Sequence, residues 1–91
     1  MSRVRGIWVA RLVVSERTRG KVAGRHGIAV EALVAHVVGV RGLPYRWDLD
    51  PERGRRALID LVLDGRQVVV VLYPADDLGE DCYRLGSAYR L

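Results

Sequence analysis

Two arginines near the C-terminus, Arg84 and Arg90, are well placed to hold a phosphate group. They belong to a segment, residues 82–90, that carries two Arg and two Tyr. In an unbroken strand, residues separated by an even number lie on one face, so the two guanidinium groups could clamp a phosphate together. The alternative is an ordinary solvated outer face. Gly86 between them could instead mark a bulge, which would break the shared face.

Two kinds of side chain could carry a proton. His26 is one of two histidines in the chain, and imidazoles titrate close to neutral pH. It precedes Gly27 at the expected end of a helix, where the helix dipole favours a cation, so a capping role is the simpler interpretation. Tyr83 and Tyr89 could donate a proton or stack on a base. Aromatic residues on a small sheet more often belong to the core, however.

The charge of the chain permits a polyanionic partner without demanding one. The 91 residues include 15 Lys and Arg against 11 Asp and Glu, for a formal net charge of +4. Lys21 is the single lysine; the arginine bias suits bidentate phosphate or carboxylate contacts, but a GC-rich genome would also produce it.

Several classes of protein are disfavoured by composition. Cys82 is alone, which precludes an internal disulfide and fits a reducing compartment. Two His without a carboxylate at ligand spacing predict no metal site, and we expect no cofactor. No apolar run approaches the ~20 residues of a membrane span, so we expect a cytoplasmic protein without membrane contact.

Few elements can position these side chains, because a chain of this length allows one domain. Residues 7–14 are rich in β-branched types and predict a first strand. Ser15 can cap a helix that runs to about Arg25, with Gly27 as its stop. Residues 29–38 predict a second, amphipathic helix, because apolar residues recur there at helical spacing. These residues are Val30, Leu33, Val34, Val37 and Val38.

The C-terminal half predicts strands. We expect a loop and short strand over residues 43–47, a loop over 48–54, and strands at about 55–63, 67–73 and 82–90. Asp64-Gly65 predicts a tight hairpin turn, and the four valines that begin at Val68 predict a central strand. The order predicts an α+β two-layer sandwich: an N-terminal strand, two helices, then a three- or four-stranded antiparallel sheet. We expect the apolar helix face to pack on Val69, Val71 and their neighbours in the sheet.

Short motifs along most of the chain resemble the BrnT group of small toxins, within the wider RelE-like class of type II toxins. Arg25-His26-Gly27-Ile28 between the two helices, followed by Glu31, is similar to their sequence at this place. Gly54-Arg55-Arg56 and Gly65-Arg66 resemble their basic segment and hairpin, and residues 84–90 resemble their terminal strand. The chain departs from the group at Tyr89, where the relatives often carry Arg, and after Leu91, where a basic helix is usual.

The resemblance implies a single RelE-like toxin domain over residues 1–91 and a metal-independent endoribonuclease, a hydrolase that arrests growth. The ribose 2′-OH would attack the adjacent phosphorus and leave a 2′,3′-cyclic phosphate, while cations stabilise the growing charge. The implied catalytic residues are Arg84, Arg90, Tyr89 and His26, and the implied substrate-binding residues are Arg55, Arg56, Lys21 and Arg66. The implied partners are RNA, free or on the ribosome, and a cognate antitoxin in a hetero-oligomer.

A non-catalytic function is the alternative. The same fold could bind nucleic acid or an acidic protein through its arginine surface, since a fold does not fix a function. The absence of the usual basic helix after Leu91, together with the weak acid–base candidates, favours this alternative. A neighbouring gene for a ribbon-helix-helix or helix-turn-helix antitoxin would favour the toxin.

Overall fold

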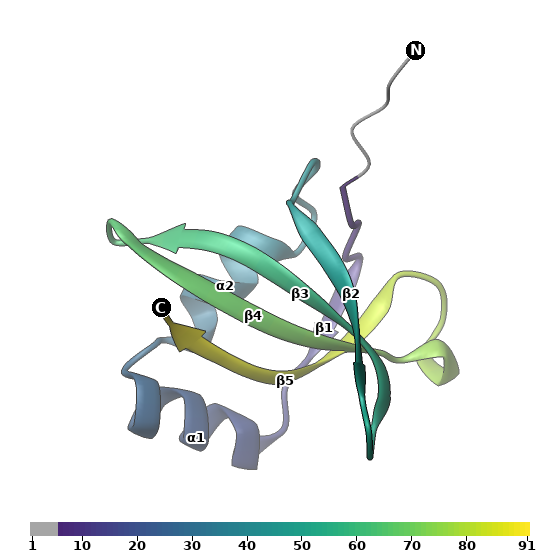
Figure 1. The fold of residues 1–91 in the computed structure, drawn as a ribbon, viewed down its shortest axis with the longest axis horizontal. Coiled ribbons are helices and arrows are strands. Elements are labelled where there is room, and N and C mark those ends of the chain that lie inside the picture. The colour runs from purple at the N-terminus through teal and green to yellow at the C-terminus, as the bar shows by residue number, and fades with distance from the viewer. Residues whose placement is uncertain (1–5) are drawn as a thin grey trace.

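A computed structural model describes residues 6–91 of the chain (Figure 1). The elements are β1 (Arg11–Val13), α1 (Glu16–His26), α2 (Val30–Val37), β2 (Tyr45–Asp50), β3 (Gly54–Leu63), β4 (Arg66–Pro74), the 3-10 turn η1 (Asp76–Leu78) and β5 (Cys82–Arg90). The five strands form one sheet in the order β1-β5-β4-β3-β2. The predicted α+β class is confirmed.

The predicted antiparallel sheet is confirmed for β2 to β5, and the N-terminal strand joins it as a fifth strand, which makes the whole sheet mixed. β1 pairs with β5 in parallel, whereas the strands from β2 to β5 are joined as an antiparallel meander. The predicted first strand is also broken, because Ile7 and Val9 form only isolated bridges, to Leu43 and Val38. Local composition indicates an extended segment but carries no information about the strand beside it or the direction in which that strand runs.

Both ends of α1 are capped by the predicted residues. The Ser15 hydroxyl accepts a hydrogen bond from the Thr18 N–H at 3.1 Å, which satisfies one of the free amides of the first turn. Gly27 adopts a left-handed φ of 61°; its N–H donates to Ala23 O at 3.0 Å, and the following Ile28 N–H donates to Val22 O at 3.4 Å. The second predicted helix is confirmed over Val30–Val37.

The predicted loop over residues 48–54 was too long. β2 continues to Asp50, which pairs with Gly54, so only three residues form the turn. Asp48 and Asp50 look like loop residues in the sequence, but here their carboxylates bind Arg56 on the solvent side of the sheet. The Asp64-Gly65 hairpin is confirmed, with positive φ angles of 51° and 74° at its two turn residues.

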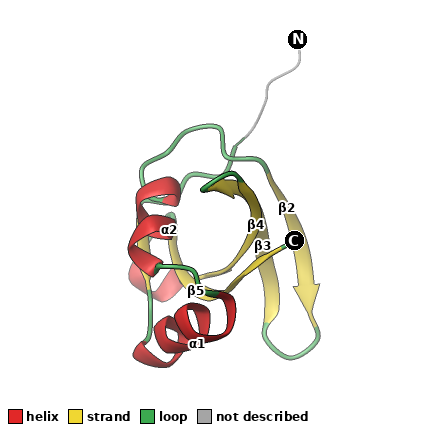
Figure 2. Ribbon diagram, turned by 90° about the vertical axis from the view of Figure 1, so that its left-hand side faces the viewer, coloured by secondary structure: helices red, strands yellow, loops and turns green. Residues whose placement is uncertain are grey.

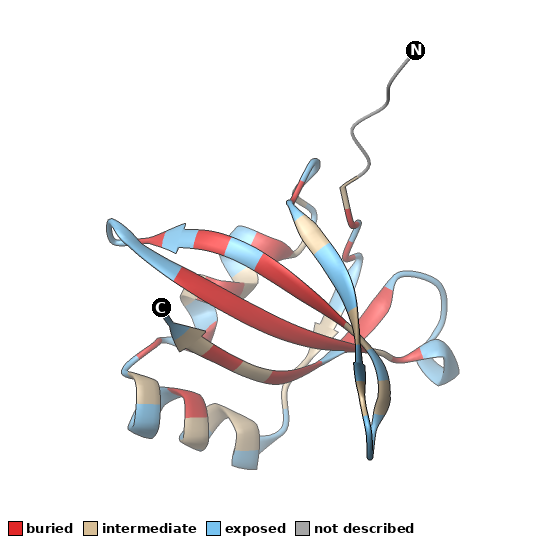
Figure 3. Ribbon diagram, in the orientation of Figure 1, coloured by how far each residue is buried: buried red, intermediate tan, exposed pale blue. Residues whose placement is uncertain are grey.

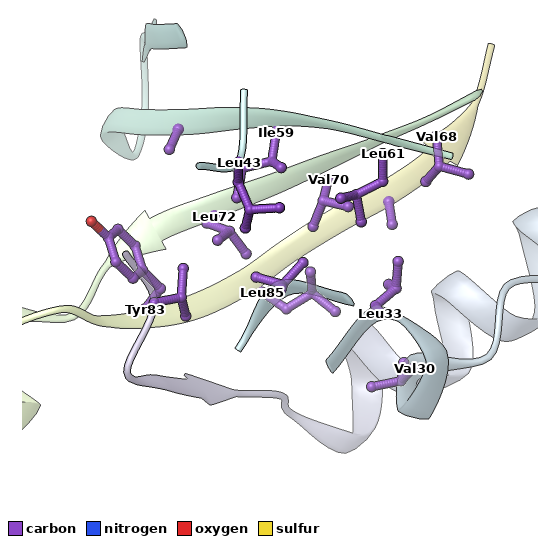
Figure 4. Close-up of a cluster of buried hydrophobic side chains, with 14 of the residues drawn as sticks. Val30, Leu33, Leu43, Ile59, Leu61, Val68, Val70, Leu72, Tyr83 and Leu85 are labelled. Carbon is purple, nitrogen blue, oxygen red and sulfur yellow. The ribbon is translucent and has the colours of Figure 1, made fainter. Parts of the chain in front are cut away.

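The two faces of the sheet carry separate apolar clusters, and the helices cover only one of them. β4 is central and buried along most of its length (Figure 3). Val30 and Leu33 of α2 pack with Val68, Val70 and Leu72 (Figure 4).

The predicted packing of the helix on Val69 and Val71 was therefore wrong. These two side chains lie on the opposite face, with Leu58 and Tyr73. Four consecutive valines hide the alternation that would tell which face of the strand meets the helices.

Leu33 tests the helix-covered core, because its side chain is fully buried. We expect Leu33→Ala to lower the free energy of unfolding by ~2–5 kcal/mol, since the lost packing leaves a cavity. Val62→Ala is the control at a side chain that is 62% exposed, and it should change stability by no more than about 0.5 kcal/mol. Urea denaturation measures both; equal effects of the two substitutions would contradict this packing.

Candidate functional site

A groove lined by cations opens between α1 and the β2–β3 hairpin. In Figure 1, α1 lies at the lower left, beneath β5, and the tip of the β2–β3 hairpin lies at the lower right. The groove has a volume of about 820 Å³ and contains Arg17, Lys21 and Arg25 from α1 and Arg53 from the hairpin tip. The remaining lining residues are Ser15, Thr18, Gly20, Gly24 and Gly86. Among the described residues, 6–91, none with a carboxylate side chain lines this space, which we call the basic groove.

The α1 wall of the basic groove combines two features that weaken a helix. Arg17, Lys21 and Arg25 follow one another at four-residue intervals, about 6 Å apart along the axis, and like charges at this spacing repel. Gly20 and Gly24 lie between them with open space where a Cβ would stand, although each glycine costs a helix about 1 kcal/mol relative to Ala. The low surface between the cations lets the backbone of a ligand approach α1 closely.

The charge of the basic groove is not neutralised by the surrounding side chains. Arg17, Arg25 and Arg53 form no ion pair within residues 6–91. In the same part of the chain, Lys21 Nζ donates only to the backbone oxygen of Gly86, at 3.4 Å. Cations gathered between low-dielectric walls produce a strong local potential, so the groove attracts anions.

The hairpin wall is held in place by Asp50. Its Oδ1 accepts hydrogen bonds from the N–H groups of Glu52 and Arg53, at 2.8 and 3.1 Å. Its Oδ2 accepts from Tyr73 Oη at 3.0 Å and from Arg56 Nη1 at 3.2 Å. These bonds fix the hairpin tip, so that the Arg53 guanidinium lies 4.1 Å from the centroid of the Tyr73 ring.

The same contacts keep the Asp50 carboxylate and the Arg56 guanidinium ionised. The pKa of Asp50 lies below its usual range, mainly because of the two backbone hydrogen bonds and then the Tyr73 hydroxyl. The pKa of Arg56 is raised by its hydrogen bonds to Tyr73 and Asp48. Arg56 is thus a structural partner of carboxylates in the hairpin, and its charge is already compensated.

A bulge in β5 makes the floor of the basic groove. Val71 pairs with Ser87 and Leu72 with Leu85, which leaves Gly86 as an extra residue in β5. A Cβ at position 86 would lie 2.3 Å from Tyr73 Cε2, so only glycine lets the Tyr73 ring lie there.

The bulge also decides the positions of the two predicted clamp residues. Arg84 now pairs with Tyr73, whereas Arg90 pairs with Val68, whose side chain faces the helices. The expected shared face of Arg84 and Arg90 was therefore wrong, and the alternative of a bulge at Gly86 is confirmed.

Three of the four predicted catalytic residues gather around the C-terminus of α1. Arg90 Nη2 donates to Gly27 O at 3.3 Å, and the rings of His26 and Tyr89 are 6.4 Å apart between centroids. Arg84 does not belong to this group. Its two η nitrogens bind both oxygens of the Asp77 carboxylate, at 2.9 and 2.8 Å.

The four predicted substrate-binding residues are dispersed. Lys21 lies in the basic groove, whereas Arg56 binds the acidic side chains of β2. The Arg55 guanidinium stacks at 4.3 Å on the ring of Trp47, and Arg66 begins β4 beside the other hairpin turn.

The sequence interpretation missed Arg17, Arg25 and Arg53. The four-residue spacing of the first two from Lys21 was a visible signal. Nothing local places Arg53 opposite α1, because its position depends on the pairing of β2 with β3.

No protein-family model, curated protein or solved structure matches this chain. Within residues 6–91, none of the helices is long and apolar enough to cross a membrane. In the same part of the chain, no three His, Cys, Asp or Glu side chains are grouped so that they could hold a metal ion. The chemistry of the basic groove therefore rests on the residues described above.

Two glycines of the basic groove should respond oppositely to alanine. Gly86→Ala must displace the Tyr73 ring and should lower the free energy of unfolding by about 1–3 kcal/mol, as overpacking does. Gly24→Ala meets open space on a helix and should raise it by up to about 1 kcal/mol. Urea denaturation measures both changes, and a tolerated Gly86→Ala would show that the close packing of Tyr73 is not required.

Proposed function

We propose that the protein binds single-stranded RNA in the basic groove and cleaves it, as a RelE-like toxin of a type II toxin–antitoxin pair. The observation that carries the proposal is the gathering of Arg17, Lys21, Arg25 and Arg53 in one groove to which no described residue contributes a carboxylate. A polyanion is the ligand class that such a groove fits, because each neutralised phosphate releases counterions and adds affinity.

The geometry of α1 favours a strand over a small anion. Its three cations repeat about once per helical turn, so they form a row of regularly spaced positive charges. A nucleic-acid strand presents a row of regularly spaced negative phosphates. Gly20 and Gly24 leave the surface between the cations low enough for a sugar–phosphate backbone. Tyr89, half-buried at the end of α1, offers an aromatic ring on which a base could stack.

The group around the end of α1 supplies the residues for cleavage. In the proposed reaction the 2′-OH attacks the adjacent phosphorus, the bond from phosphorus to the 5′ oxygen breaks, and a 2′,3′-cyclic phosphate and a 5′-OH result. His26 and Tyr89 would move the two protons, one from the 2′-OH and one to the leaving oxygen. Arg90 and Arg25 would stabilise the charge on the phosphate. Arg84, the other predicted phosphate-clamp residue, could contribute only after its guanidinium leaves the Asp77 carboxylate.

The same groove suits an antitoxin. An acidic segment laid across Arg17, Lys21 and Arg25 would neutralise the groove and exclude RNA at once. Electrostatic steering would make this association fast and sensitive to salt. In this proposal the toxin acts in the cytoplasm, on RNA that is free or on the ribosome, and is silent while the antitoxin occupies the groove.

Binding without cleavage is the second candidate, and one observation favours it. Neither His26 nor Tyr89 is among the residues that line the basic groove. A module that holds RNA or an acidic protein without reacting would need only the cations. Cleavage and binding are therefore tested separately.

RNA binding should be measured by fluorescence anisotropy with a short single-stranded RNA at several salt concentrations. Arg17→Gln, Lys21→Gln and Arg25→Gln should each weaken binding about equally for all sequences. Each should also reduce the slope of log affinity against log salt by about 0.7, the value for one lost phosphate contact on a single strand. Arg66→Gln, outside the groove, is the control and should leave the slope unchanged. Equal slopes for all four variants would contradict binding in the groove.

Cleavage should appear as growth arrest on induced expression, with RNA fragments that end in cyclic phosphate and still form in EDTA. His26→Ala and Tyr89→Phe should each slow cleavage by about 10²–10⁴-fold, as loss of a general acid or base does, while RNA affinity stays within twofold. RNA that is bound but never cut would establish the binding module. Harmless expression at good soluble yield would likewise rule out the toxin.

A further inference from the structure

The sheet ends in an open edge at β2. Within residues 6–91, this strand is the last of the sheet and is paired on one side only, with β3. Figure 2 shows it on the side of the sheet away from both helices. Two of its apolar side chains lie in solvent, Trp47 with 42% and Leu49 with 72% of its surface exposed. Proteins usually protect such edges, because free backbone groups invite another strand.

One hydrogen bond fixes which backbone groups of β2 are free. Asp60 N donates to Pro44 O at 3.2 Å, so residue 44 directs its backbone toward β3. In an antiparallel pair the direction alternates along the strand, so Arg46 and Asp48 also face β3. Tyr45, Trp47 and Leu49 therefore direct their N–H and C=O groups outward.

The sequence of β2 is complementary to itself when a second copy lies antiparallel with Trp47 at the centre. Trp47 then meets Trp47, Tyr45 meets Leu49, and Arg46 meets Asp48 of the second copy. The outward groups of the two strands meet one another, so Tyr45, Trp47 and Leu49 each donate to and accept from the other strand. Apolar side chains meet on one face of the joined sheet and opposite charges meet on the other.

Other registers are worse. A shift by two residues in one direction would place Arg46 against Arg46, and in the other direction Asp48 against Asp48, and like charges directly opposite are destabilising. A shift by one residue would place the outward groups against groups that already bind β3. The edge thus favours one register on both charge and hydrogen-bonding grounds.

Contacts within the monomer already orient the side chains of β2 for this register. The Trp47 ring is held by Arg55, whose guanidinium lies 4.3 Å from its centroid, and by Tyr45, whose ring is 5.8 Å away in an edge-on arrangement. On the other face, Arg46 lies 3.7 Å from Asp60 within its own chain. Pairing with a second copy would place Asp48 of that copy opposite Arg46, so that opposite charges also meet across the interface.

We propose that the protein forms a symmetric dimer by antiparallel pairing of β2 with β2 of a second copy, centred on Trp47. The two five-stranded sheets then become one continuous sheet. Because the twofold axis is perpendicular to the sheet at Trp47, the two basic grooves open on the same side of it. The proposal does not depend on RNA binding or cleavage.

Sedimentation equilibrium of the full chain tests the dimer, with Leu49→Pro as the decisive variant. The Leu49 N–H points outward, so proline removes a hydrogen bond from the dimer but none from the β2–β3 pair. We expect the wild type to dimerise and Leu49→Pro to weaken dimerisation by at least about tenfold, with an unchanged melting temperature. Leu49→Ala keeps the N–H and is the matched control, which should weaken dimerisation less.

Arg46→Glu provides a second test if Leu49→Pro does not fold. It places like charges opposite one another in the dimer, and in the monomer it replaces one exposed ion pair, with Asp60, by an exposed like-charge contact of small effect, so it should also weaken dimerisation at a nearly unchanged melting temperature. A wild type that stays monomeric at millimolar concentration would overturn the proposal. So would folded Leu49→Pro or Arg46→Glu proteins that dimerise as well as the wild type.

Discussion

The packing of the Tyr73 ring against Gly86 is the contact on which the rest of the site depends. The extra residue in β5 lets the ring lie over its backbone, and the Tyr73 hydroxyl then reaches the Asp50 carboxylate at the end of β2. Asp50 in turn holds the tip of the β2–β3 hairpin, which brings Arg53 over the same ring. One glycine thus links the floor of the basic groove to its second wall. The same bulge separates Arg84 from Arg90, which would otherwise share a face.

The basic groove concentrates features that reduce stability. Three cations repel one another along α1, and two glycines interrupt that helix where a stronger helix former would be accommodated without a clash. Elsewhere in residues 6–91 the chain pairs arginines with carboxylates, as at Arg56 and Arg84. Sequences that break local rules in one place commonly do so for function. A bound polyanion would relieve the repulsion, so ligand binding and the stability of α1 are coupled.

Much of the fold was predictable because its signals are local. The Ser15 and Gly27 caps, the Asp64-Gly65 hairpin and the central position of β4 all follow from residue type and short-range pattern. The errors concern properties that depend on which strands pair with one another in the folded chain. The four valines of β4 conceal which face meets the helices, and nothing in β1 indicates its parallel partner. The groove was predicted only at Lys21, because Arg53 reaches α1 through strand pairing and a bulge.

The central claim is that α1 and the β2–β3 hairpin enclose the binding site for a single RNA strand. Amide chemical shifts test it most directly, during titration of the ¹⁵N-labelled protein with a short RNA whose 2′-hydroxyls are methylated to prevent cleavage. The account predicts the largest changes at Gly20, Gly24 and Gly86, which line the basic groove. It predicts small changes at Gly39 and Gly65, which lie outside the groove lining. Changes centred on Gly65, or none at the three groove glycines under conditions where RNA binds, would contradict it.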